Sequence, residues 1–123
     1  MVHTWAMKEF GQYIRTRRLA MDERVGGYSI RRTAAMVGVQ FSYLSKVERG
    51  EVAPPSEATI KKLAVVLEED PDVLLALAGK VSEDLRNVIL KRPQLFAELL
   101  RELKNTPDKS VLRLVREVRD GNW

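Results

Sequence analysis

The sequence predicts an all-α chain, with five helices in a first domain and a smaller helical extension after it. Apolar residues recur at spacings of three and four along most of the chain, which is the period of a helix buried on one face. No stretch alternates apolar and polar residues as a half-buried strand does. Ser, Asp, Pro and Gly, which start or end helices, separate the apolar segments.

Length and composition limit the organisation of the chain. Its 123 residues allow one compact domain with an extension, or two very small domains. A boundary after Gly79 divides it into a domain of residues 1–79 and an extension of residues 80–123. Cysteine is absent, which excludes disulfides and fits a reducing compartment. No apolar run has the length of a membrane span and the N-terminus lacks a signal-peptide core, so we expect a cytoplasmic protein without membrane contact.

The first helix is expected over residues 5–21, after a short arm or frayed start at residues 1–7. Its predicted core-facing residues are Phe10, Ile14 and Met21. The following DERVGG segment, residues 22–27, is expected to be a loop rather than more helix, because it contains paired glycines.

Two short helices joined by a tight turn are expected next, over residues 30–37 and 41–48. Ser29 can cap the first of them. Gly38 can adopt a positive φ at the turn, and Ala34 leaves room for the second helix to approach. The residues predicted on the shared apolar face are Ala34, Val37, Leu44 and Val47. This spacing is typical of a helix-turn-helix.

Two more helices complete the first domain. Pro54 and Pro55 exclude helix, and Ser56 caps the fourth helix. Its predicted core residues are Ile60, Leu63, Ala64 and Leu67. Asp70 and Pro71 start the fifth helix as its cap and first residue, and Gly79 ends it.

The extension is expected to form three short helices with apolar stripes. They are predicted over about 83–90, about 94–104, and after Thr106-Pro107. The stripes on the last two consist of Leu95, Phe96, Leu99, Leu100 and Leu103, and of Val111, Leu114, Val115 and Val118. Such stripes must be covered, either by the first domain or by a second copy of the chain. Because short helices are marginal alone, we favour a homodimer.

Charge is unevenly distributed. Residues 1–50 contain nine Lys and Arg against four Asp and Glu, whereas residues 51–79 contain two against six. Residues 80–123 contain ten against seven. Positive charge is therefore concentrated around the helix-turn-helix, as a phosphate-binding surface requires.

The run GVQFSYLSKVERGEVAPPSEATIKKLA resembles the Cro and phage-repressor type of helix-turn-helix regulator, the xenobiotic-response-element family. YLSKVERGEV followed by PPSEATIKKLA is its most specific part, and the resemblance covers about residues 10–79. It implies a five-helix lambda-repressor-like domain that binds double-stranded DNA. The implied function is a transcription repressor that acts as a dimer on an inverted-repeat operator. It also implies a pair between an arginine of the first helix and a glutamate of the recognition helix, here Arg18 and Glu48.

The resemblance places base contacts at the start and along one exposed face of the helix over residues 41–48. By position, the base-contacting residues are Gln40, Phe41, Ser42, Ser45 and Lys46. Gln40 suits adenine and Lys46 suits guanine. Phe41 either meets a thymine methyl group or packs against the preceding helix as core.

Phosphate contacts are expected around the same helix. Tyr43 is expected to border the DNA backbone, and Arg49 is a phosphate-contacting candidate. Ile30 stands where the family often has a phosphate-binding glutamine, so Arg31 or Arg32 must supply that contact. The link between the first two helices is longer than the family's usual one, and this 22–27 insertion either is a tolerated surface loop or brings Arg24 to the backbone.

Other functions remain open at this point. An antitoxin or a restriction-controller protein uses the same domain, and a helical interaction module could keep the fold without binding DNA. Residues 74–103 also resemble extensions of repressors that a zinc peptidase inactivates, which implies such a peptidase as a partner. An enzyme is not expected. The chain has one histidine, His3, no cysteine and no glycine-rich phosphate loop, so no catalytic, metal or cofactor site is predicted.

Overall fold

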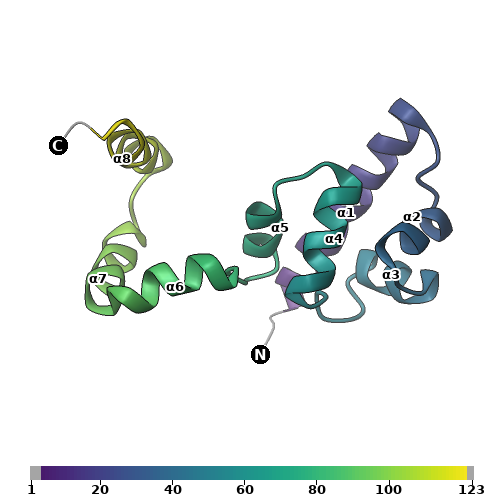
Figure 1. The fold of residues 1–123 in the computed structure, drawn as a ribbon, viewed down its shortest axis with the longest axis horizontal. Helices are drawn as coiled ribbons and strands as arrows, with labels where there is room; N and C mark the ends of the chain where they lie inside the picture. Colours follow the sequence, from purple (N-terminus) through teal and green to yellow (C-terminus); the bar gives the residue numbers. More distant parts are fainter. Residues whose placement is uncertain (1–3, 122–123) are drawn as a thin grey trace. The chain divides into compact units, whose positions relative to one another are not determined.

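The computed structural model describes residues 4–121, in which eight α-helices and no strand are present (Figure 1). The first five helices are α1 (Thr4–Val25), α2 (Ile30–Val37), α3 (Phe41–Glu48), α4 (Glu57–Leu67) and α5 (Pro71–Leu77). The last three are α6 (Glu83–Lys91), α7 (Pro93–Leu103) and α8 (Asp108–Asp120). Residues 1–3, which include His3 and begin the expected N-terminal arm, lie outside the described range.

The chain divides into two units, one ending at Ser82 and one beginning at Glu83. The first contains α1 to α5 and the second contains α6 to α8. Among the described residues, no helix combines the length and apolar character needed to cross a membrane.

The core of the first unit lies where α1, α3, α4 and α5 meet, with α2 packed on α3 and α4. All eleven predicted core residues, including Phe10, Leu44 and Ile60, are buried. Leu74 and Leu75 of α5 complete the core with no exposed surface. The helical period of apolar residues therefore predicted the buried side of each of the first four helices.

The predicted loop over residues 22–27 is wrong for its first four residues, because α1 continues to Val25. Gly26 still donates a helical backbone hydrogen bond to Asp22, at 2.8 Å. Only there does φ become positive, at 77° for Gly26 and 84° for Gly27. The chain then turns back, and the Asp22 carboxylate accepts a hydrogen bond from the Tyr28 amide at 2.8 Å. The insertion thus lengthens α1, because nothing before Gly26 opposes a helix.

The turn between α2 and α3 forms as predicted. Ser29 accepts a hydrogen bond from the Arg32 amide at 3.2 Å and caps α2. Gly38 ends α2 with φ at 89°, and its amide donates to the Ala34 carbonyl at 2.8 Å. Gln40 precedes α3 without a side-chain capping bond, so α3 lacks the stabilisation that Ser29 gives to α2.

A glycine of α1 allows the recognition helix to approach closely. Gly11 is buried, and a Cβ at this position would lie 2.7 Å from the Glu48 carbonyl oxygen and closer still to that of Val47. A backbone group cannot move aside as a flexible side chain can. Gly11 therefore fixes how closely α1 can pack against the C-terminal end of α3.

The second unit has helices but no buried residue on any of them. α6 packs on α7, and the apolar side chains of α7 and α8 remain largely accessible. Leu95 is 62% exposed and Val118 is 58% exposed. These apolar stripes are therefore uncovered within the unit, although apolar faces of this size are usually covered in a stable protein.

Candidate nucleic-acid interface

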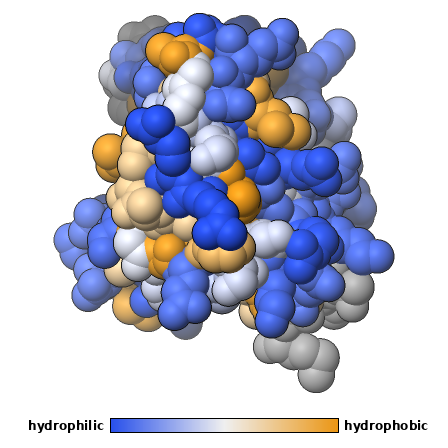
Figure 2. All heavy atoms as spheres, turned by 90° about the vertical axis from the view of Figure 1, so that its right-hand side faces the viewer, coloured by the Kyte–Doolittle hydropathy of each residue, from blue (hydrophilic) through white to orange (hydrophobic). Residues whose placement is uncertain are grey.

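Three polar side chains are exposed at the start and along the outer face of α3. They are those of Gln40, Ser42 and Lys46. None of the three has a hydrogen-bond or ion-pair partner among the described residues. Figure 2 views the molecule from the side on which α2 and α3 lie in Figure 1, and shows a mostly hydrophilic face with small hydrophobic patches. This outer face of α3 can therefore donate and accept hydrogen bonds without first breaking any.

Phe41 lies at the border between α3 and α2. Its ring is 41% exposed, and the Arg31 guanidinium lies 3.8 Å from the ring centroid. A cation over an aromatic face is a favourable contact, which fixes the positions of the two side chains relative to each other. The expectation that Phe41 packs as core is wrong, because the ring stacks against a charged group at the surface. Contact with a thymine methyl stays a prediction.

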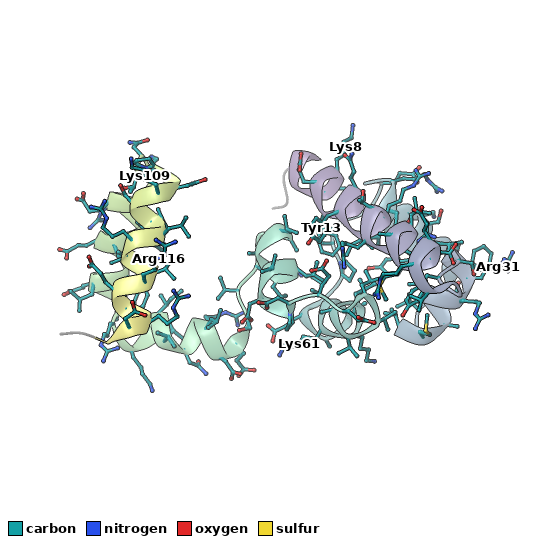
Figure 3. All side chains as sticks on the ribbon, turned by 90° about the horizontal axis from the view of Figure 1, so that it is seen from above. Lys8, Tyr13, Arg31, Lys61, Lys109 and Arg116 are labelled. Carbon is teal, nitrogen blue, oxygen red and sulfur yellow. The ribbon has the colours of Figure 1, made fainter. Side chains whose placement is uncertain are left out.

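Arg31 and Arg32 both lie in the first turn of α2 with exposed side chains. Figure 3 shows Arg31 projecting outward near the end of α1 that is remote from Lys8. The Arg32 guanidinium lies near Gly27 instead, where a Cβ would be 3.7 Å from its central carbon. Of the two arginines, Arg31 is thus the one placed against α3.

Ser45 and Arg49 are joined by a hydrogen bond across one turn of α3. Arg49 donates from Nη1 to Ser45 Oγ at 2.6 Å and from Nε to a Glu51 carboxylate oxygen at 2.6 Å. Ser45 is half-buried, whereas Arg49 and Glu51 are each about half exposed. Because the Ser45 oxygen already accepts from Arg49, its own proton remains available for an acceptor on a base or phosphate.

Tyr43, which is expected to border the DNA backbone, is half-buried. Its ring packs against the core cluster of the first unit. This burial raises the pKa of the Tyr43 hydroxyl above its ordinary value of 10.0. The hydroxyl therefore stays protonated at neutral pH and keeps its proton as a donor.

Arg18 and Glu48 form the predicted pair between α1 and α3. Arg18 donates from Nε and Nη2 to the two carboxylate oxygens of Glu48, at 2.7 and 2.9 Å. A third donor reaches the Tyr28 carbonyl at 3.1 Å. The hydrogen bonds to Glu48 raise the pKa of Arg18 above its ordinary value, despite burial. Two parallel hydrogen bonds fix the orientation of α3 relative to α1.

Arg24 does not join this surface. It lies near Glu68 at the end of α4, with 3.6 Å between Nη2 and a carboxylate oxygen, and it donates to Met21 Sδ at 3.1 Å. Both partners lie on the helices that carry the core, not on α2 or α3. Residues 22–27 thus place Arg24 near the end of α4, and a contact between this exposed residue and the DNA backbone stays a prediction.

The sequence did not predict two further features of this surface, the carboxylate of Glu51 and a basic groove on α1. Glu51 pairs with the predicted phosphate-contacting residue Arg49. Lys8 and Arg15 line a groove beside the end of α3, together with neutral residues of α1. The spacing of the groove residues could have predicted the second feature, because residues 8, 12, 15, 16 and 19 lie on one face of a helix.

This arrangement of two short helices, capped by Ser29, turned at Gly38 and locked by Arg18 and Glu48, defines a helix-turn-helix domain. Residues 23–74 match the family model described as helix-turn-helix, so the first unit contains a domain of the Cro and phage-repressor type. An uncharacterized HTH-type transcriptional regulator of Bacillus subtilis (strain 168), RghRB, is 36% identical over 75 residues. That alignment covers 61% of this chain and 50% of the relative, so the chain spans about half the length of the curated relative it matches. No solved structure matches the chain significantly.

Proposed function

We propose that the protein is a DNA-binding transcriptional regulator that places α3 in the major groove. The observation that carries this proposal is the outer face of α3, where Gln40, Ser42 and Lys46 are exposed and unpaired. Polar groups that face solvent without partners are suited to base edges, which present a distinct pattern of donors and acceptors in that groove. An acidic or bulky face would instead favour a protein partner. The similarity to a regulator of Bacillus subtilis supports the same proposal.

The residues around α3 divide into two roles in this proposal. Gln40 and Lys46 read adenine and guanine edges, and Ser42 and Ser45 supply further hydrogen bonds. Phe41, held by Arg31, presents its exposed edge to a thymine methyl group. Arg31, Arg32 and Arg49 contact phosphates, and Tyr43 borders the backbone with its protonated hydroxyl. Phosphate contacts set affinity and register, whereas base contacts set specificity.

The proposed regulator acts as a two-fold dimer and represses transcription in the cytoplasm. One recognition helix contacts too few base pairs to select a site among the competing sequences of a genome. Two copies can read an inverted repeat with half-site centres about 34 Å apart, or a multiple of that distance. The uncovered stripes of α7 and α8 give a second copy an apolar surface to bind. The resemblance of residues 74–103 to peptidase-inactivated repressors would make a zinc peptidase a further partner.

Selection of duplexes from a random pool by the purified full-length protein tests this function. We expect enrichment of an inverted repeat whose half-sites contain adenine and guanine at the positions facing Gln40 and Lys46. Enrichment of an asymmetric or single half-site would contradict binding as a two-fold dimer but would still support sequence-specific DNA binding. No enrichment, with no binding to random duplex at low salt, would contradict DNA binding and favour the protein-interaction module. An antitoxin or restriction-controller role predicts the same enrichment and differs only in the genes beside the selected sites.

A further inference from the structure

A groove runs between α1 and the C-terminal end of α3, and the residues that α1 contributes to it have not been assigned to DNA so far. It has a volume of about 520 Å³, and α1 contributes Lys8, Gln12 and Arg15 to its lining, with Glu48 and Arg49 on the other side. A second hollow of about 260 Å³ shares Arg15 and Arg49 with it and extends to Ser45. The two hollows therefore follow one path along the side of α3.

Charge along this path is positive. Lys8 and Arg15 are exposed, and neither has an ion-pair partner among the described residues. The carboxylate in the lining, that of Glu48, is held by two hydrogen bonds from Arg18, which neutralise its charge. Gln12 and Thr16 add neutral hydrogen-bond donors on the same face of α1. Such a surface attracts an anion. The carboxylate that opposes it at the Arg49 end is that of Glu51, which is bonded to Arg49 at 2.6 Å.

The path is continuous with the outer face of α3, which is proposed to contact the bases. Arg49 lines both hollows and donates to Ser45, a proposed base-contacting residue, at 2.6 Å. Lys8 and Arg15 are seven residues apart on α1, which separates them by about 10 Å along the helix axis. Duplex DNA carries one phosphate per about 3.4 Å of axis on each strand, so the two cations can meet different phosphates.

We propose that this α1 groove binds the phosphate backbone of the DNA whose bases α3 reads, with Lys8 and Arg15 as its cations. The inference rests on the proposed DNA-binding function and extends it from α2 and α3 to α1. The groove binds a phosphodiester backbone rather than a free anion, because its path starts at the outer face of α3, which is proposed to contact the bases. Lys8 and Arg15 then add affinity for every sequence and no preference between bases.

The test measures the affinity of full-length protein for two duplexes, the pool-selected site and a random sequence of equal length, at several salt concentrations. Lys8→Gln and Arg15→Gln should each reduce the steepness of log affinity against log salt by about 0.9, the contribution of one phosphate. Each substitution should lower the affinity for the selected duplex and for the random duplex by the same factor. Because both side chains are exposed, thermal melts of the variants should match that of the unmodified chain.

Lys61→Gln is the matched control, since it removes one positive charge from α4 of the same unit. Figure 3 places Lys61 on the side of the unit away from Lys8, and in its ion pair with Glu57 the two side chains are 50% and 29% exposed. This control should leave the salt dependence unchanged. If Lys8→Gln and Arg15→Gln behave like Lys61→Gln while the unmodified chain binds its selected site, the groove proposal is overturned and DNA reading stands. If the unmodified chain binds neither duplex, the proposed function is contradicted, and the groove proposal that depends on it is contradicted as well.

Discussion

Arg18 and Glu48 join α1 to the recognition helix through two nearly equal hydrogen bonds, 2.7 and 2.9 Å long, with only 10% and 5% of their side chains exposed. The carboxylate lies at the end of α3, and the guanidinium lies near the middle of α1. A tilt of α3 would lengthen at least one of the two bonds. The pair therefore links the stability of the first unit to the orientation of its outer face.

Glu48→Ala should destabilise the fold by about 3–5 kcal/mol, because it leaves the Arg18 guanidinium buried without its partner. Denaturant melts measure this change in the free energy of unfolding. Glu51→Ala is a matched control, since the Arg49–Glu51 bond is equally short but about half exposed, and it should cost under about 1 kcal/mol. Equal effects of the two substitutions would show that burial of the Arg18 pair contributes nothing. A double-mutant cycle with Arg18 then isolates the pair.

Gly11→Ala should destabilise the first unit even though alanine favours helix by about 1 kcal/mol over glycine. The new methyl group would meet backbone carbonyls of α3, with 2.7 Å to that of Glu48, and overpacking of this kind costs about 1–3 kcal/mol or more. Thr16→Ala, at an exposed position of the same helix, should leave stability within about 0.5 kcal/mol. A Gly11→Ala chain that melts at or above the unmodified temperature would contradict the close approach of α1 and α3.

Glu51→Gln should strengthen binding to random duplex. The substitution removes a carboxylate that now holds Arg49 at 2.6 Å and that would repel a phosphate at the same place. Salt titrations should show a dependence steeper by up to about 0.9, one additional phosphate. Glu57→Gln removes a negative charge from α4 instead and should change neither quantity. Unaltered binding by Glu51→Gln would mean that Arg49 does not face the backbone.

A fragment ending at Ser82 should fold, because the core lies within α1 to α5. It should run as a monomer, since the apolar stripes of α7 and α8 are missing, and it should bind the selected duplex more weakly than the full chain. Light scattering coupled to size exclusion measures the mass of the fragment and of the full chain at micromolar concentration. A dimeric fragment would place the interface in the first unit. A monomeric full chain would contradict the dimer itself.

Sequence pattern predicted the core and the turn because both depend on neighbours three or four residues apart. The apolar period selected Ala34, Val37, Leu44 and Val47, and all four are buried. The end of α1 was misplaced because the polar residues after Met21 continue the helix without adding an apolar signal. The paired glycines correctly predict a break, and the helix ends at the first of them, Gly26.

The parts of the candidate interface that escaped prediction depend on how helices pack. The groove beside Arg15 exists because Gly11 lets α3 approach α1, a distance that no local pattern encodes. The stacking of Arg31 on Phe41 likewise depends on the angle at Gly38. Residue types indicated which side chains could meet DNA, whereas their partners within the fold had to be seen in three dimensions.

The central claim, that the outer face of α3 reads base sequence, is tested most directly by Lys46→Ala. Affinities of this variant for the selected duplex, for duplexes changed at single base pairs and for random duplex should be measured at one salt concentration. We predict a loss of about 1–3 kcal/mol on the selected duplex, relaxed preference at one base pair in each half-site, and a much smaller loss on random sequence. Equal losses on all the duplexes, with preference intact at every base pair, would contradict base reading by Lys46 and reduce its role to that of a phosphate contact.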